Sequence, residues 1–413
     1  MSIKLDSLIA ETGTKFQVFV LPRHLKSFSL PELIQVSVAP QGIRPGPRDD
    51  RMYVCNAVSK RPYTKDYLPP FQGPVHPPVG PGEDGHFNHL SVDSPEFVCA
   101  AAYASARRTL DIWEDYMGRN IAWPFRLEFE MLEIIPLARM PGVRIGWGFL
   151  EFGFAGRSSD ELDLSHPYAL NMEATARGIG RDIFLSEVGI PLRSQLTPEL
   201  VGVVKTTEDI SALLAVLHSH KILNHLLDAT SGDLFSPDVI GRIGELSEVP
   251  FFRLALNQET MSSVPTKPRF HMPLTGALVE LLIQVFKYEL ISLQIIDPEL
   301  FGRLEKLSYP DKTDYMVQTE FDIAYLRYKP EFKICFQKAR DYLGMLIARA
   351  WPGLSCESLT FFDVGLALLS ADQFVSGGKH IATLRRCFSR REIGLPKATI
   401  ALEPANLVPS PNV

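Results

Sequence analysis

The sequence predicts an α+β protein in which a β-rich N-terminal part precedes a mainly helical region. Up to residue 92 the chain contains short runs of β-branched and aromatic residues, which are separated by many prolines and show little helical periodicity. From residue 93 on, long segments carry apolar residues at helical spacing. A chain of 413 residues exceeds what one simple core usually holds, so several packed parts are expected.

We expect four parts along the chain. Residues 1–92 form the β-rich, proline-rich part, and residues 93–300 form a region built around a cleft. Residues 301–395 form a helical C-terminal part. Prolines in residues 396–413 favour an extended or frayed tail.

Composition excludes several classes of function. The formal net charge of -6 argues against a nucleic-acid partner. We see no apolar run long enough to cross a bilayer and no secretory signal, so we expect no membrane partner. The five cysteines are scattered without a CxxC pair, which argues against a zinc ribbon or a disulfide framework. A reducing, cytoplasmic location is therefore expected.

The N-terminal part predicts strands and loops. Residues 16–21, 34–40 and 51–58 (FQVFVL, IQVSVAP and RMYVCNAV) are typical of strands. Residues 68–87 are dominated by proline and glycine and predict a long loop on the surface.

A long helix is predicted from residue 94 to Gly118. Ser94 is a good N-cap, Pro95 suits the first turn, and Glu96 complements the helix dipole. Residues 125–139 and 143–156, joined through Pro141-Gly142, are then expected to form a β-hairpin.

The remaining segments predict helices. One helix covers about residues 171–189, and a short loop leads to a second long helix. Together the later predicted helices span residues 206–232, 273–296, 332–351 and 360–374. The short basic run at residues 385–392 is expected to be a solvated surface.

The helix at residues 171–189 contains an unusual pattern. Arg177 and Arg181 are four residues apart, so their like charges share one helical face. Gly178 and Gly180 lie between them, although glycine destabilises a helix interior. Like charges on one face and glycines inside a helix are both locally unfavourable, so this part of the helix is expected to be a functional or otherwise constrained site.

The stretch RGIGRDIFLSEVG, residues 177–189, resembles the metal-binding helix of thermolysin-like (gluzincin-type) zinc metallopeptidases. In that family the helix carries HExxH and ends at a glycine, which Gly189 matches. Arg177 and Arg181 stand where the two zinc-binding histidines would be, and Gly178 stands where the general-base glutamate would be. The resemblance extends over most of the chain, from about Phe87 to the C-terminal helices.

Two further segments resemble the same family. In VKTTEDISALLAVL, Lys205 falls where the third zinc ligand, a glutamate, would be, and Asp209 matches its supporting aspartate. In FHMPLTGALVELL, His271 falls where a histidine that stabilises the transition state would be. The resemblance thus implies a degenerate metallopeptidase, a pseudoenzyme whose three zinc ligands have all become cations.

The replaced residues exclude the zinc mechanism. Zinc needs lone pairs from two histidines one helical turn apart, and a glutamate to activate its water. Arginine stays protonated and offers no lone pair. Glycine offers no base. We therefore expect neither a metal nor a cofactor.

Three interpretations of the altered site remain open. In the first, acids near the cations in sequence (Glu173, Asp182, Glu208 and Asp209) neutralise them and leave an inert scaffold.

In the second interpretation, the cations bind an anionic small molecule or peptide, since paired arginines can hold a carboxylate or phosphate in bidentate fashion. The ligand-binding residues would be Arg177, Arg181, Lys205, Asp182 and Glu173. This is our leading hypothesis.

In the third, the cleft has been repurposed in a metal-independent biosynthetic enzyme, a cyclase, isomerase or lyase. Asp209, His271 and Glu187 are then the candidates for moving a proton.

Overall fold

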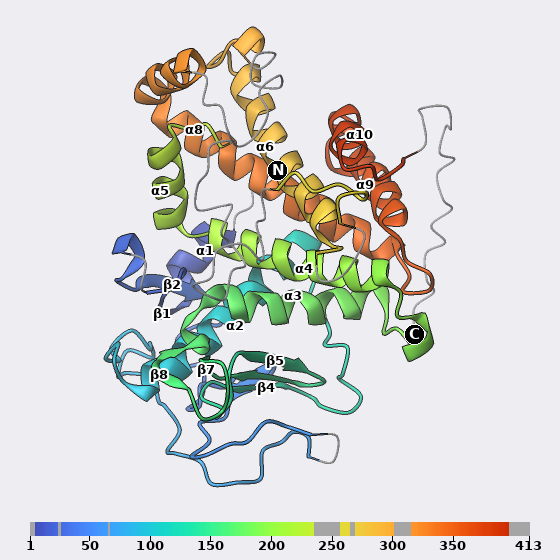
Figure 1. The fold of residues 1–413 in the computed structure, drawn as a ribbon. Coiled ribbons are helices and arrows are strands. Elements are labelled where there is room, and N and C mark those ends of the chain that lie inside the picture. The colour runs from blue at the N-terminus through green and yellow to red at the C-terminus, as the bar shows by residue number, and fades with distance from the viewer. Residues whose placement is uncertain are drawn as a thin grey trace, which may run out of the picture.

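A computed structural model describes residues 5–23, 26–64, 67–234, 257–264, 269–300 and 315–395 (Figure 1). The expected tail at residues 396–413 lies outside the described residues. Strands lie mostly in the N-terminal half and helices dominate the C-terminal half, so the predicted α+β class is confirmed.

The chain begins with helix α1 (Leu5–Thr12) and the antiparallel pair β1 (Thr14–Val18) and β2 (Glu32–Val36). Phe16 of β1 is fully buried, and its ring stacks on that of Phe87 with centroids 4.8 Å apart. The predicted strands at residues 16–21 and 34–40 overlap β1 and β2, but the observed strands begin and end earlier in the chain.

A four-stranded sheet has the order β3-β4-β6-β5. It comprises β3 (Met52–Val54), β4 (Leu132–Ile135), β5 (Val143–Gly146) and β6 (Phe149–Phe152). The first three strands in that order are parallel, and β5 lies antiparallel to β6 at one edge. The predicted hairpin between residues 125–139 and 143–156 is wrong. The two segments do pair, through β4 and β6, but these strands are parallel. The antiparallel hairpin is formed by β5 and β6, which both lie within the second segment.

Helix α2 (Pro95–Met117) confirms the predicted helix and both of its caps. The Ser94 side chain accepts a hydrogen bond from the backbone N–H of Phe97, at 3.1 Å. Gly118 ends the helix with φ 66°, a left-handed conformation that glycine adopts without strain. Trp113 and Tyr103 are buried on this helix.

The next helices are α3 (Met172–Val188), α4 (Pro198–Leu217) and α5 (His220–Thr230). One long helix over residues 206–232 was expected, but the helix is interrupted at Ser219, between α4 and α5. There the Ser219 side chain accepts from the backbone N–H of Ile222 at 3.1 Å and caps α5. Before α3, the short strands β7 (Phe154–Ala155) and β8 (Asp163–Pro167) pair.

The C-terminal helices are α6 (Met272–Ser292), α8 (Tyr315–Ala350), α9 (Phe361–Val375) and α10 (Ile381–Arg390). Helix α8 kinks where Tyr328 leaves helical geometry, close to Pro330 within the helix. The basic run at residues 385–392 was expected to be a solvated surface, and Arg386 and Arg390 are exposed. The same run buries Cys387, Phe388 and Arg391. Single 3-10 turns are found at Lys26–Phe28, Tyr168–Leu170, Arg193–Gln195 and Trp351–Gly353.

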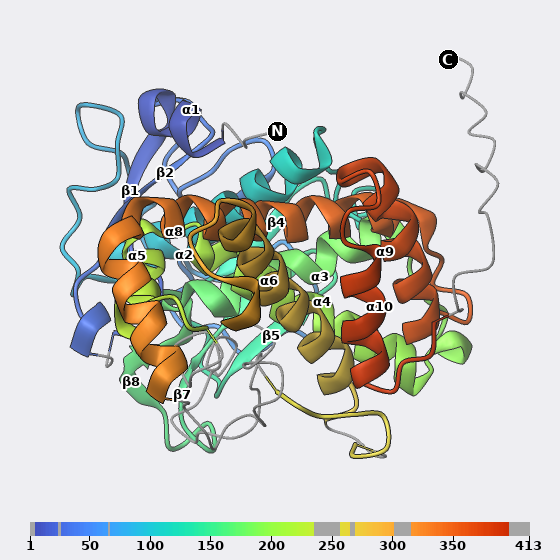
Figure 2. The ribbon, with the colours of Figure 1, turned by 90° about the horizontal axis from the view of Figure 1, so that it is seen from above.

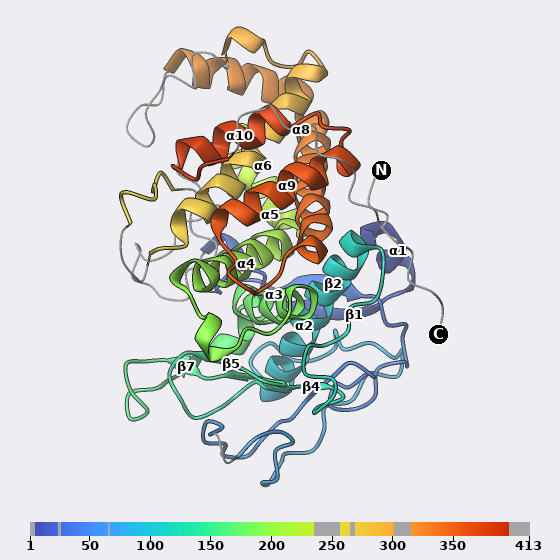
Figure 3. The same ribbon diagram turned by 90° about the vertical axis from the view of Figure 1, so that its right-hand side faces the viewer.

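The elements stack in layers. The sheet lies below, α2 and α3 cover its upper face, α4 runs beside α3, and α6, α8, α9 and α10 form the top (Figures 1 and 3). Seen from above, the top helices cover α3 and α4 (Figure 2). One hydrophobic cluster extends from Phe16 in β1 to Phe388 in α10. Within the described ranges, no helix has the length and apolar character needed to cross a membrane.

Candidate functional site

The two glycines of α3 are explained by packing on both sides of the helix. A Cβ on Gly178 would lie 2.6 Å from Cδ2 of Leu150, so this residue faces the sheet. A Cβ on Gly180 would lie 1.9 Å from Oγ of Ser211, so this residue faces α4. Helix α3 thus lies closer to β6 and α4 than a helix with side chains at these positions could.

Arg177 is buried and paired with two acids on α4. Its side chain is 3% exposed, with Nη1 2.5 Å from Oδ1 of Asp209 and Nη2 3.4 Å from Oε2 of Glu208. Burial opposes the guanidinium charge, but Asp209 and Glu208 raise the pKa of Arg177 above its ordinary value. Glu173, 1% exposed, contributes to this pKa shift to a smaller extent. The main neutralising partners of Arg177 are therefore on α4.

Asp209 connects Arg177 to His271. Nε2 of His271 lies 3.2 Å from Oδ2 of Asp209, and the His271 side chain is 3% exposed. Although burial acts to raise the pKa of Asp209, Arg177 and His271 hold it below its ordinary value. His271 precedes α6, and its carbonyl accepts a hydrogen bond from Thr206 Oγ1 at 3.2 Å. A buried chain Arg177–Asp209–His271 thus joins α3, α4 and the start of α6.

Two more carboxyl groups near this chain have raised pKa values. Burial raises the pKa of Glu208, opposed by Arg177 and reinforced by Asp209. Burial also raises the pKa of Asp182 to about 7, opposed by Arg181. Among the described residues, Oδ2 of Asp182 has no hydrogen-bond partner. Both carboxyls are therefore able to carry a proton closer to neutral pH than an exposed acid.

Arg181 and Lys205 are the more accessible cations. Both side chains are half-buried, and Arg181 donates through Nη1 to the backbone carbonyl of Ile145 on the edge strand β5, at 3.0 Å. The charges of both side chains oppose the rise in the pKa of Glu208 that burial causes. Within the described parts of the chain, neither cation forms an ion pair with a carboxylate. Both charges act on Glu208, whose direct ion-pair partner is Arg177, so Arg181 and Lys205 stay available to an added anion.

The structure does not bring every predicted residue to the cluster. Glu187 lies ten residues beyond Arg177, about 15 Å along the α3 axis. It pairs there with Arg119, the two charged atoms being 2.5 Å apart. Glu187 is thus a partner of a surface arginine, away from Asp209 and His271. The acceptor for Arg181 on Ile145 is a backbone atom, for which no side-chain pattern could give a signal.

No metal centre is found in the described ranges, since they contain no group of three or more His, Cys, Asp or Glu side chains able to hold an ion. A narrow apolar cavity lies on the other face of α4, lined by Val203, Ile210, Leu278 and Trp351 among others. Its volume is about 20 Å³, which is room for one or two waters and too small for a typical ligand.

Comparisons with known proteins add no assignment. No protein-family model matches the chain, and no curated protein matches it. The residues of the site therefore carry the functional reasoning.

Proposed function

We propose that this chain is a catalytically altered, metallopeptidase-like protein that works without zinc and binds an anionic small molecule or peptide at Arg181 and Lys205. The observation that carries the proposal is that these two half-buried cations form no direct ion pair within the described residues, whereas Arg177 beside them is paired with Asp209. The proposal also rests on the resemblance to gluzincin-type peptidases, in which Arg177, Arg181 and Lys205 stand where the zinc ligands would be.

The cations have different roles in this proposal. Arg177 holds α3 to α4, because its charge is already balanced by Asp209 and Glu208. Arg181 offers the planar fork that recognises a carboxylate or phosphate, and Lys205 adds a second charge from α4. Glu208 repels an anion when ionised. Since its pKa is raised, it gains a proton readily, and anion binding is favoured at lower pH.

The proposal is tested by thermal stabilisation with defined probes. These are inorganic phosphate, succinate, and a short peptide with a free C-terminal carboxylate compared with its amidated form. We expect at least one anion to raise the melting temperature of the wild type and to have no effect on the variant Arg181→Ala/Lys205→Ala. Arg193→Ala, which removes an exposed cation on another turn, serves as the matched control and should respond as the wild type does.

Equal stabilisation of the double variant and the wild type would overturn the assignment of the site. So would an absence of stabilisation by every anion.

A proton-transfer enzyme is the second candidate, favoured by the raised pKa values of Glu208 and Asp182. Such an enzyme would be a cyclase, isomerase or lyase acting on a bound anionic molecule. Glu208→Gln separates the two proposals. A binding protein should hold anions at least as tightly after this change. An enzyme should lose conversion of a bound probe, followed by NMR, while binding persists.

A further inference from the structure

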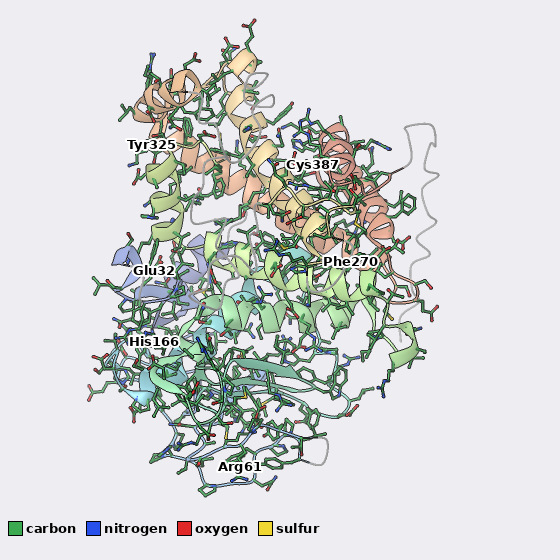
Figure 4. The ribbon with its side chains drawn as sticks, in the orientation of Figure 1. Glu32, Arg61, His166, Phe270, Tyr325 and Cys387 are labelled. Carbon is green, nitrogen blue, oxygen red and sulfur yellow. The ribbon has the colours of Figure 1, made fainter. Side chains whose placement is uncertain are left out.

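A second polar cluster lies on the face of the sheet opposite α3. Side chains alternate across strands, and Leu150 faces α3 through Gly178. Glu151 on β6 and Glu133 on β4 therefore point to the other face, where each is at most 1% exposed. Residues 60–64 and 67–71 lie against them on this face, in the region where Figure 4 labels Arg61.

Lys60 and Glu151 form a fully buried pair. Both side chains are 0% exposed, and Nζ of Lys60 contacts Oε1 of Glu151. Nζ also lies 3.1 Å from the ring centroid of Tyr63. The ring centroids of Tyr67 and Phe71 lie 5.4 and 5.8 Å from Nζ. Burial lowers the pKa of Lys60, opposed by Glu151. Burial thus favours the neutral amine, which is the nucleophilic form of lysine, whereas the ring faces and Glu151 favour the ammonium and hold Nζ in place.

The carboxyl group of Glu151 is held by donors on both oxygens. The backbone N–H of Tyr63 lies 3.1 Å from Oε1 and 3.2 Å from Oε2. Nη1 of Arg144 lies 3.4 Å from Oε2. Donors placed in this way stabilise the negative oxygen that develops when a nucleophile adds to a carboxyl carbon.

Glu133 supplies a second carboxylate close to the pair. It accepts hydrogen bonds from the Tyr53 hydroxyl at 2.8 Å, the Phe71 N–H at 2.9 Å and the Tyr63 hydroxyl. Its charge acts on Lys60. Tyr63 donates hydrogen bonds to both acids. Its hydroxyl donates to Glu133, and its backbone N–H donates to Glu151. Glu133 is therefore linked to the pair through Tyr63.

We infer that Lys60 and Glu151 condense to an intramolecular isopeptide bond, with Glu133 as the proton carrier. Nζ attacks Cδ of Glu151, and the tetrahedral intermediate is stabilised by the Tyr63 N–H and Arg144. One carboxyl oxygen of Glu151 then leaves as water. The ammonium supplies both protons of that water, one of them by way of Glu133, and the third stays on the amide nitrogen. The step needs no oxidant and no co-reactant.

The buried site provides the proximity of the two groups and the exclusion of water that this condensation lacks in solution. Amide formation in water is opposed by solvent and by the need to bring two groups together. Reacting groups held in contact gain effective molarities of about 10⁵–10⁸ M, and a buried site releases water into the bulk. The bond joins residues 91 apart in sequence. It would fix the segment that contains Lys60 to the sheet covalently.

Intact mass spectrometry of the purified, denatured wild type tests the inference. We expect a mass below that of the sequence by one water molecule. A tryptic digest should contain one linked species that joins the Lys60 and Glu151 peptides, with no cleavage after Lys60. Lys60→Arg, which keeps the charge and removes the nucleophile, should have its full sequence mass. So should Glu133→Gln.

Wild-type protein at its full sequence mass, with the two peptides separate in the digest, would show that the pair is only an ion pair and overturn the inference. Complete linkage in Glu133→Gln would remove the role of Glu133. Because the wild-type mass decides the main point, the result does not depend on how the variants fold.

Discussion

Replacement of Arg177 by methionine should destabilise the protein far more than the same change at Arg181. Arg177→Met removes the strongest attraction acting on Asp209, which stays buried at 3% exposure. Loss of one partner of a buried ion pair costs about 3–5 kcal/mol in unfolding free energy. Arg181 is half-buried and bonds one carbonyl, so Arg181→Met should cost at most about 1–2 kcal/mol.

A double-mutant cycle makes this prediction specific to the pair. In Arg177→Met/Asp209→Leu neither charge of the pair remains, so the loss should be smaller than the sum of the single losses. We expect a coupling energy of at least about 2 kcal/mol. Urea denaturation followed by circular dichroism measures each unfolding free energy, with comparison limited to variants of equal slope. Additive losses, or a cost for Arg177→Met below about 1 kcal/mol, would refute the reasoning.

The same pair sets a pH dependence. The pKa of Asp209 is lower in the folded protein than its ordinary value of 3.8. Its contribution to stability is therefore complete above that value and is lost as pH falls through the lower, folded pKa. In Arg177→Met the effect of burial on the pKa of Asp209 is no longer opposed by the arginine, so this carboxyl takes up a proton at a higher pH than in the wild type. The stability difference between wild type and Arg177→Met should therefore be largest at neutral pH and narrow as pH falls.

Further predictions concern the neighbouring positions. Gly180→Ala should cost about 1–3 kcal/mol in urea unfolding, because its Cβ would overlap the hydroxyl on α4 that the glycine faces. Asp182→Asn should stabilise the protein relative to wild type by a margin that grows from about pH 4 to about pH 7, up to about 4 kcal/mol. The reason is that burial raises the pKa of Asp182 to about 7, so the folded wild type loses stability as pH rises through that range; an unchanged margin would contradict this. If the resemblance to gluzincins is correct, Arg177→His/Arg181→His/Lys205→Glu should bind one zinc ion per chain by metal analysis after dialysis, whereas the wild type should bind none.

Local signals in the sequence were enough to predict several elements. Ser94 and Gly118 mark both ends of α2, because capping depends on residues within one turn. The parallel pairing of β4 with β3 and β6 was not predictable in this way. It joins segments far apart in the chain, and the Pro141-Gly142 turn favoured a local hairpin. The break at Ser219 was hidden by apolar periodicity that continues on both sides.

The candidate site shows the same limit. Helical spacing places Arg177 and Arg181 on one face, and proximity in sequence named four acids that could neutralise the cations: Glu173, Asp182, Glu208 and Asp209. The structure pairs Arg177 with two of them, Asp209 and Glu208, since α3 and α4 pack side by side. Sequence spacing cannot say which residues of two helices meet, because that depends on how closely their backbones approach.

Calorimetric titration with succinate tests the central claim most directly. The account predicts one binding site per chain, with binding that tightens as pH falls, because the raised pKa of Glu208 lets it gain a proton more readily than an exposed glutamate. Loss of both cations in Arg181→Ala/Lys205→Ala should weaken binding at least about tenfold, since each charge-assisted contact contributes more than about 1.4 kcal/mol. Equal affinity in wild type and this variant, or no binding of succinate and of inorganic phosphate to the wild type, would contradict the account.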